Sequence, residues 1–340
     1  MLTRLYRISL LLLLAIPVYA QNSNSVTPEI IADLIPDLTP KLAPRLALGL
    51  TPGLTPEISI TKQNLINSSC QSIANKLSSV SFQECIARNL SPSQHQTTKQ
   101  HHLLIKEYPP IISRRQPQAK ILLLGGIHGD EYSSVTIMFK WMKILDKYHS
   151  GLFHWKVAPL VNPDGLLQKK SQRINANGID LNRNFPNNGD AQASLQYWKS
   201  RAYSDPRRYP GTQPASEIET RWIIELINEF KPDAIVAVHA PFGIVDYDGP
   251  TPPPNRLGPL YLKLLGTYPG SLGNYAGLQQ NIPVVTIELP YAGIMPNEKE
   301  VGRIWVDMVR WLRNNIPENK TNTATAQTQS AQRKKTNHSK

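Results

Sequence analysis

Residues 122–131 read "LLLGGIHGDE", and the way this stretch changes from apolar to polar suggests how the chain folds. Three leucines lead into Gly125 and Gly126, and His128 and Glu131 follow. A buried strand that ends in a glycine turn has this form, because glycine interrupts a strand and polar side chains then fill the loop. An ordinary polar loop fits the same letters, so the rest of the chain has to decide whether the imidazole and the carboxylate are functional.

Apolar runs of strand length alternate along the chain with amphipathic segments of helical period. The strand-like runs are "KILLLGG" (120–126), "WKVAPLVN" (155–162), "DAIVAVHA" (233–240) and "PVVTIELP" (283–290). The helix-like segments are "SSVTIMFKWMKILDKY" (133–148), "SEIETRWIIELINEF" (216–230) and "EVGRIWVDMVRWL" (300–312). This alternation predicts an α/β fold with a largely parallel sheet and helices on both faces. Ligands bind such sheets beyond the carboxyl ends of the strands, so the residues there are the candidates for a site.

Three of the predicted strands end in residues that can ligate a metal or move a proton. His128 and Glu131 follow the first, His239 ends the third, and Glu288 ends the fourth. Two imidazoles and a carboxylate are a common ligand set for catalytic zinc, and a further carboxylate can serve as general base for hydrolysis. The spacing of His128 and Glu131 alone is weak support, because such pairs arise by chance. Their order along the chain with His239 and Glu288 is stronger support.

Several blocks of sequence together identify a family. They are "GGIHGDE", "NPDG", "NANGIDLNRNFP", "YPGTQPASEIET", "HAPFGIVDYDGP", "GSLGNYAG" and "PVVTIELP". Over residues 105–315 the chain resembles the zinc carboxypeptidase family, and within it the murein peptide amidase A type. The resemblance implies an α/β/α sandwich with a mostly parallel mixed sheet and one zinc ion per chain. It places that zinc on His128, Glu131 and His239, and makes Glu288 the general base.

The resemblance also implies roles for three residues of "RINANGIDLNR" (173–183). Arg173 is expected to polarise the scissile carbonyl and to stabilise the oxyanion. Asn182 and Arg183 are expected to hold the terminal carboxylate of the substrate. A guanidinium suits both tasks, because its planar fork matches a carboxylate and its charge favours developing negative charge. In the alternative, both arginines are surface loop residues.

Other positions in the matching region stay open. Tyr268 and Tyr275 both lie where a family tyrosine near the scissile bond is expected, and the sequence does not choose between them. Pro241 can hold a cis peptide bond that turns the chain after His239. Residues 246–248, Asp-Tyr-Asp, either contact a zwitterionic substrate side chain or shape a loop.

The amino-terminal residues predict export. Residues 1–20 carry two arginines, an apolar run too short to span a bilayer and a small residue at position 20, as a cleavable signal peptide does. An uncleaved anchor is the alternative. Export predicts a periplasmic or secreted protein, and in such compartments two cysteines favour a disulfide over a metal or redox site.

Cys70 and Cys85 lie in a segment with helical spacing and a second helix start at Ser81 and Glu84, which form a capping-box pattern. In one continuous helix their Cα atoms would lie about 22 Å apart, too far for a bridge. We therefore expect a disulfide-bridged helical hairpin at residues 61–99, ahead of a catalytic domain at 100–316. Its role is structural.

The two ends of the chain have unusual compositions. Within residues 21–60, leucine recurs every four positions from Leu34 to Leu54, with prolines between, which argues against a helix and favours an extended linker. A docking strip is the alternative. Residues 317–340 are polar and basic, so a disordered tail is expected, and it carries part of the net charge of +12. The charge permits weak wall or membrane-surface contact through the tail or the repeat, and no nucleic-acid motif accompanies it.

These observations predict an exported zinc metallopeptidase that hydrolyses the γ-D-glutamyl to meso-diaminopimelate bond of murein peptides. A carboxypeptidase for ordinary L-peptides and a deacylase of N-acyl amino acids are the alternatives among enzymes. A cell-wall-binding protein without catalysis is the alternative from another class. The sequence does not indicate an oligomeric state.

Overall fold

The computed structural model describes residues 56–111 and 117–316. The predicted signal peptide (1–20), nearly all of the predicted Leu/Pro linker (21–60) and the basic tail (317–340) lie outside the described residues. Those assignments therefore stay predictions. Among the helices of the described ranges, none combines the length and the apolar character that crossing a bilayer requires.

Nine strands of the described residues form one mixed sheet, in the order β1-β2-β4-β3-β5-β9-β6-β8-β7. The strands are β1 Ser91–Gln96, β2 His102–Tyr108, β3 Ala119–Leu124, β4 Phe153–Ala158, β5 Ala234–His239, β6 Ile244–Asp248, β7 Arg256–Leu257, β8 Leu260–Leu262 and β9 Val284–Glu288. The central strands β4, β3, β5 and β9 are parallel, as is the pair β6 and β8. The other four pairings, toward the two edges, are antiparallel. The parallel part is thus confined mainly to the centre, where the sequence predicted it.

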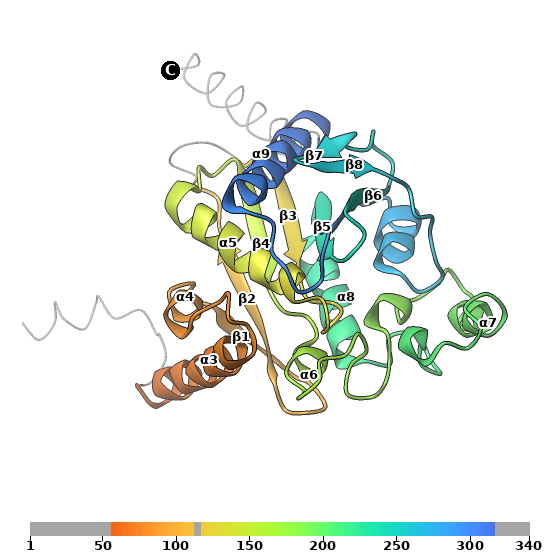
Figure 1. Ribbon diagram of the computed structural model, residues 1–340, viewed down its shortest axis with the longest axis horizontal. Coiled ribbons are helices and arrows are strands. Elements are labelled where there is room, and N and C mark those ends of the chain that lie inside the picture. Colours follow the sequence, from red (N-terminus) through yellow and green to blue (C-terminus); the bar gives the residue numbers. More distant parts are fainter. Residues whose placement is uncertain (1–55, 112–116, 317–340) are drawn as a thin grey trace, which may run out of the picture. The chain divides into compact units, whose positions relative to one another are not determined.

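Helices cover both faces of this sheet, which confirms the predicted α/β class (Figure 1). The α-helices are α3 Pro56–Lys76, α4 Phe82–Ile86, α5 Tyr132–Tyr148, α6 Pro163–Leu166, α7 Ala193–Ser200, α8 Ile218–Phe230 and α9 Glu298–Asn315. Short 3₁₀ turns η1 Leu181–Arg183 and η2 Pro206–Arg208 and a π-helical segment η3 Gly273–Gln279 complete the described elements. The three longest predicted helical segments correspond to α5, α8 and α9.

Alternation along the central strands explains the two layers of core. Successive side chains of a strand point to opposite faces, so a run of apolar residues fills both. In β3, Ile121 and Leu123 pack with α5 and α9, whereas Leu122 and Leu124 pack with α8. All four leave no exposed surface. An uninterrupted apolar run was therefore the sequence signature of a strand buried on both faces.

The helices dock through one apolar stripe each. In α9, Ile304, Met308 and Leu312 lie four residues apart and are buried. Asn297 is the N-cap of this helix: its side chain accepts a hydrogen bond from the Glu300 amide, and the Glu300 carboxylate accepts one from the Asn297 amide. This capping box satisfies two backbone donors that would otherwise lack partners.

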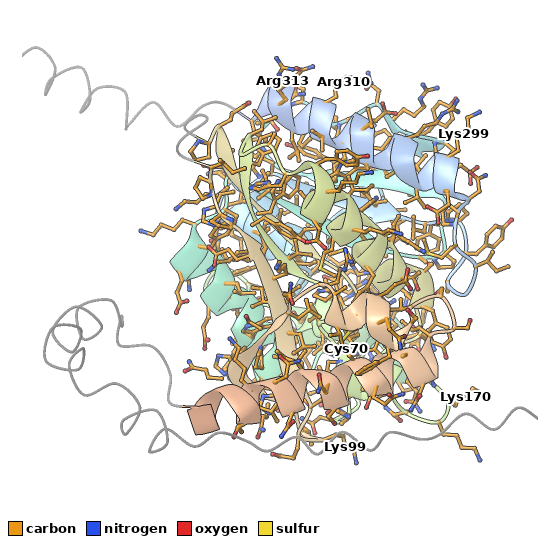
Figure 2. The ribbon with its side chains drawn as sticks, turned by 90° about the vertical axis from the view of Figure 1, so that its left-hand side faces the viewer. Cys70, Lys99, Lys170, Lys299, Arg310 and Arg313 are labelled. Atoms are coloured by element: carbon orange, nitrogen blue, oxygen red, sulfur yellow. A yellow bond between two sulfur atoms is a disulfide. The ribbon has the colours of Figure 1, made fainter. Side chains whose placement is uncertain are left out.

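A disulfide between Cys70 and Cys85 joins α3 to α4, as the sequence predicted. Figure 2 shows Cys70 on the side of α3 that faces α4. The capping box of Ser81 and Glu84 starts α4. The segment differs from the prediction at both ends, because α3 already begins at Pro56 and the chain enters the sheet as β1 from Ser91. The helical hairpin therefore spans α3 and α4 only, and β1 belongs to the sheet of the catalytic domain.

Polar contacts attach this hairpin to the sheet domain. The Lys76 ammonium at the end of α3 donates to the carbonyl oxygens of Gln168 at 2.6 Å and Lys169 at 3.2 Å. The Ser79 hydroxyl lies 2.8 Å from that of Thr136 in α5. The hairpin thus contacts the loop that follows α6 as well as α5.

Removal of the disulfide should lower stability without changing the fold. Because the bridge closes a loop of 15 residues, the Cys70→Ser/Cys85→Ser protein should lose about 3 kcal/mol of unfolding free energy. Urea unfolding of the two proteins measures this. Reduced wild-type protein should lose a similar amount, which separates the bridge from the packing of the sulfur atoms. Two thiols that react freely with an alkylating reagent in native protein would contradict the assignment.

Candidate metal centre and active site

The turn after β3 delivers His128 and Glu131 to the carboxyl edge of the sheet. Gly126 has a φ of +62°, which glycine adopts at no steric cost. A Cβ atom on Gly129 would lie 2.2 Å from the backbone of Gly165 in α6, so only glycine permits this close approach. Glu131 occupies the position just before α5 begins. The two glycines therefore shape the loop that presents the imidazole and the carboxylate.

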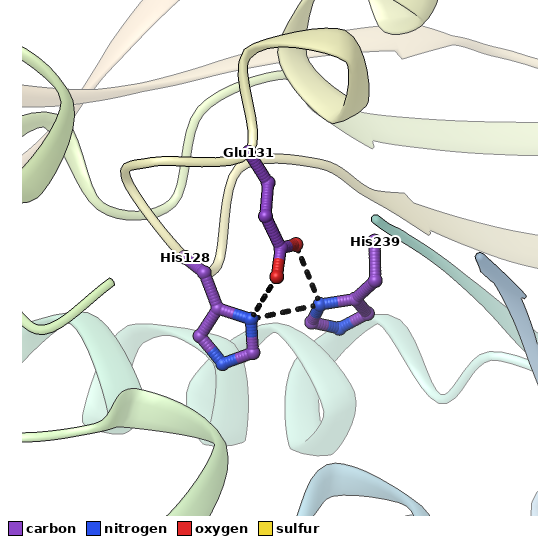
Figure 3. A group of neighbouring side chains, drawn as sticks. All are labelled: His128, Glu131 and His239. Carbon is purple, nitrogen blue, oxygen red and sulfur yellow. Dashed lines mark hydrogen bonds and ion pairs between the residues drawn. The ribbon is translucent and has the colours of Figure 1, made fainter. Parts of the chain in front are cut away.

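His239 reaches the same place from the next strand. It is the last residue of β5, which pairs in parallel with β3. Figure 3 shows the three side chains converging: Nδ1 of His128 and Nδ1 of His239 are 3.1 Å apart. Oε1 of Glu131 lies 2.8 Å from the first of these nitrogens, and Oε2 lies 3.1 Å from the second. The three side chains are buried, and their ligand atoms all fall within 4.8 Å of one another.

Asp180 lies at the edge of this cluster and contacts both His128 and Arg173. Its Oδ1 lies 3.1 Å from Nε2 of His128, and its Oδ2 accepts a hydrogen bond of 2.9 Å from Nε of Arg173. When Nε2 donates to the carboxylate, Nδ1 keeps its lone pair and directs it at the cluster. Burial raises the pKa of Asp180, but Arg173 and His128 outweigh burial and hold that pKa well below its usual range. Asp180 is therefore a fixed negative charge behind the imidazole.

Arg173 lies directly beside the cluster. Its Nη1 is 3.6 Å from Oε1 of Glu131, and its side chain is mostly buried. Asp180 fixes the orientation of the guanidinium, which lines the cavity and places Nη1 3.1 Å from Nδ1 of His128. This is the arrangement required of a group that stabilises negative charge on a substrate oxygen.

Glu288 is the neighbour of His239 across the sheet. The two residues are register partners in the parallel pair β5 and β9, so their side chains point to the same face. Glu288 is 7% exposed, and its Oε2 has no hydrogen-bond partner among the described residues. Burial raises the pKa of this carboxyl, the charge of His239 opposes the rise, and Glu131 adds to it. A buried carboxylate with a free oxygen beside a cluster of this kind suits a proton acceptor.

Asn182 and Arg183 lie on η1 at another wall of the same cavity. The Arg183 guanidinium packs over the ring of Tyr268, with its carbon 4.7 Å from the centroid. Asn182 uses Oδ1 to accept a hydrogen bond from the Leu272 amide, which leaves its NH₂ group available for an acceptor. Both side chains carry N–H groups that can donate to a carboxylate.

These residues line one cavity of about 430 Å³. It also receives the charged side chains of Asp130, Asp205, Arg207, Arg208, Asp246 and Asp248. The volume is that of a small-molecule or peptide-end site.

Comparison with known proteins agrees with this geometry. Residues 92–247 match the model of the zinc carboxypeptidase family. The chain is 33% identical to murein peptide amidase A of Escherichia coli (strain K12) over 180 residues, which cover 50% of this chain and 70% of that protein. The chain belongs to the zinc carboxypeptidase family. It is also 30% identical over 176 residues to murein peptide amidase A of Vibrio campbellii, across 50% of this chain and 68% of that protein.

A solved structure has a similar fold. Carboxypeptidase A from Helicoverpa armigera superposes with a TM-score of 0.53 at 16% identity, over 68% of this chain and 71% of that one. The family match ends at residue 247, before β9. The position of Glu288 in the site therefore rests on the sheet register and on the cavity, not on the extent of that match.

The donor set fits the zinc that the family name implies. Two imidazole nitrogens and one carboxylate are the ligands of many catalytic zinc sites, and such sites place a hydrogen-bonded carboxylate behind a ligating histidine. His128, Glu131 and His239 meet the first condition, and Asp180 meets the second. The buried cluster has the chemistry of a zinc carboxypeptidase centre.

The structure brings together every candidate site residue predicted from the sequence, and it adds Asp180. That carboxylate lies inside the quoted "GIDLNR" block, two residues before Asn182, but nothing local distinguishes it from a turn residue. Of the two candidate tyrosines, Tyr268 lines the cavity, whereas Tyr275 is buried and its ring stacks on Phe185. The Ala240–Pro241 peptide is cis, as expected.

The metal assignment predicts the zinc content of the purified protein. The wild type should carry about one zinc ion per chain, and His239→Ala should retain almost none, because it removes one of three ligands. Elemental analysis after dialysis measures this. His149→Ala is the control, because His149 bonds to the Pro109 carbonyl away from the cavity. Full zinc content in the His239 variant would contradict the assignment.

Asp180 predicts a separate effect on affinity. Asp180→Asn keeps the size of the side chain but removes the charge that polarises His128. The affinity for zinc should fall about 10- to 100-fold while all three ligands remain. Competition with a chromogenic chelator measures the dissociation constant, and an unchanged constant would show that Asp180 only packs.

Proposed function

We propose that this protein is an exported zinc metallopeptidase that hydrolyses the γ-D-glutamyl to meso-diaminopimelate bond of murein peptides. One observation carries the catalytic part of the proposal. The free oxygen of Glu288 lies in the same cavity as the three-residue metal cluster and the carboxylate-binding wall of Asn182 and Arg183. An unpaired buried carboxylate costs stability, so folding alone does not account for it, whereas a general base requires a free oxygen beside the metal.

Zinc bound to His128, Glu131 and His239 would supply a Lewis acid that polarises the scissile carbonyl and acidifies water. Glu288 would accept the proton of the attacking water on Oε2 and later deliver it to the leaving amine. Its raised pKa suits this exchange, because a base must also be able to return the proton.

The arginines position the substrate in this proposal. Arg183 and Asn182 would bind the terminal carboxylate, which places the scissile carbonyl beside Arg173. Because Asp180 fixes Arg173, its guanidinium needs little reorganisation as negative charge develops on the substrate oxygen. Arg183 would bind the ground state and the transition state alike, whereas Arg173 would favour the transition state.

Three observations support murein peptides and export. Two relatives, 33% and 30% identical to this chain over the aligned residues, are named murein peptide amidase A. The disulfide between Cys70 and Cys85 is typical of proteins in oxidising compartments, where wall peptides are found. Residues 1–20, with the pattern of a signal peptide, fit the same location. L-peptides and N-acyl amino acids remain the competing substrates, and the test below separates them.

The proposed role of Glu288 predicts a loss of turnover without a loss of metal. Glu288→Gln should lower kcat on γ-D-glutamyl-meso-diaminopimelate peptides by about 10²- to 10⁴-fold, because the amide cannot accept the proton. Its zinc content and its substrate Kd should change little. Stopped assays of released diaminopimelate, with elemental analysis of the same samples, measure both.

Arg183→Ala is the matched comparison. It should mainly raise KM, since Arg183 binds a carboxylate present before and during the reaction. If Glu288→Gln stays within a few-fold of the wild type, Glu288 is not the base. If the wild type cleaves L-peptides or N-acyl amino acids but no murein peptide, the substrate assignment is wrong and the metallopeptidase assignment stands.

A further inference from the structure

The sheet arranges the inner surface of the cavity in rows. Register partners in neighbouring strands share a face, so His239 lies beside Glu288, and one row deeper Ala237 lies beside Thr286 and Thr286 beside Asp246. The next row places Asp248 beside Val284. Each row is about 7 Å from the previous one, because side chains on one face are two residues apart. The row after the catalytic one therefore combines the small side chains of Ala237 and Thr286 with Asp246, and the row after that contains Asp248.

Asp246 and Asp248 both line the cavity. Asp246 is 93% buried, since 7% of its surface is exposed, and Asp248 is partly buried. Within the described part of the chain, no lysine, arginine or histidine forms an ion pair with either acid. Burial and the charge of Asp246 raise the pKa of Asp248 to about 6. A buried and a partly buried carboxylate without a cation are costly to keep.

The other charges of the cavity are largely matched. Arg207 pairs with Asp130 at 2.8 Å, and Arg208 lies 3.7 Å from Asp205. Arg173 pairs with Asp180. Away from the metal cluster, three charged side chains of the cavity have no ion-pair partner among the described residues. They are Arg183 on one wall and Asp246 and Asp248 at the base. A ligand that carries a carboxylate and, some distance away, an ammonium group would complement both.

A purely structural role does not explain the charges. Asp246 accepts a hydrogen bond from the Leu265 amide at 3.0 Å, and Asp248 accepts one from the Thr267 hydroxyl at 3.0 Å. These bonds hold the segment that leads to Tyr268. A neutral amide oxygen would accept the same bonds, so the loop requires the oxygen atoms but not the negative charges.

We propose that Asp246, with Asp248, binds an ammonium group on the side chain of the residue released by hydrolysis. The inference rests on the proposed function, because it takes Arg183 to hold the carboxylate of that same residue. Asp246 lies one row of the sheet, roughly 7 Å, from the row that contains His239 and Glu288. The extended four-carbon stem of a lysine-like side chain covers such a distance. The enzyme therefore selects leaving residues with a side-chain cation, and diaminopimelate belongs to that class.

Paired substrates test the selection. The first pair is γ-D-glutamyl-meso-diaminopimelate and γ-D-glutamyl-2-aminopimelate, which differ only in the distal amino group. A second pair, L-peptides ending in lysine or norleucine, differs in the same group without the murein linkage. The wild type should favour the amine-bearing member by about 10- to 100-fold in kcat/KM, the range for a hydrogen bond to a charged partner.

Asp246→Asn is the decisive variant, because it keeps the acceptor for the Leu265 amide. It should lower kcat/KM for the amine-bearing substrates about 10- to 100-fold and leave the others nearly unchanged. Asp248→Asn should give a smaller effect of the same kind. Asp205→Asn controls for the loss of one negative charge in the same cavity, and Thr267→Val controls for the loop bond. Both controls should keep the wild-type preference.

Every outcome of these experiments either supports or overturns the inference. A wild type that cleaves γ-D-glutamyl peptides without preferring the amine overturns this inference and leaves the proposed function intact. So does an Asp246 variant that slows both members of a pair equally. A wild type that cleaves only lysine-ended L-peptides, in a manner dependent on Asp246, supports the inference and refutes the murein assignment. If no peptide is cleaved, calorimetry with free meso-diaminopimelate and 2-aminopimelate decides: tighter binding of the former, lost in Asp246→Asn, supports it, and equal binding overturns it.

Discussion

The parallel pairing of β3, β5 and β9 is the constraint on which the site depends. Backbone hydrogen bonds set Leu124 beside Ala237, and His239 beside Glu288. A slip of one residue would turn each side chain to the opposite face of the sheet, so the buried apolar faces also enforce the register. Because all three strands run the same way, their polar ends gather at one edge. The two core layers therefore stabilise the sheet and also fix the distances within the cluster.

Buried charged side chains distinguish the candidate active site from the hydrophobic core. Around the metal cluster the charges are compensated locally, since Asp180 lies between His128 and Arg173. Deeper in the cavity, Asp246 and Asp248 form no ion pair with a cationic side chain of residues 56–111 or 117–316. Because a buried charge without a partner lowers stability, its presence points to a ligand more than to folding. We infer that the ligand supplies the positive charge that these two carboxylates lack.

The hairpin of α3 and α4 contacts the loop that leads to the candidate active site. Lys76 donates to two carbonyl groups in the loop after α6, and that loop continues toward Arg173. Gln172, the residue before Arg173, in turn donates its amide to the Gly165 carbonyl. The disulfide reduces the number of conformations open to the unfolded hairpin, so it favours the state in which these contacts form.

Local patterns in the sequence determined the central strands, the long helices and the residues that end them. Apolar runs reveal β3, β5 and β9 because burial on both faces requires them, and the polar residues after them become visible by contrast. The strands β1, β2 and β6–β8 were not found, because they are partly exposed, and their pairing partners, not their composition, make them strands. The role of Asp180 and the placement of Asp246 depend on contacts between residues far apart in the chain. Only the tertiary structure decided those, because register and burial are properties of paired elements and no single segment contains them.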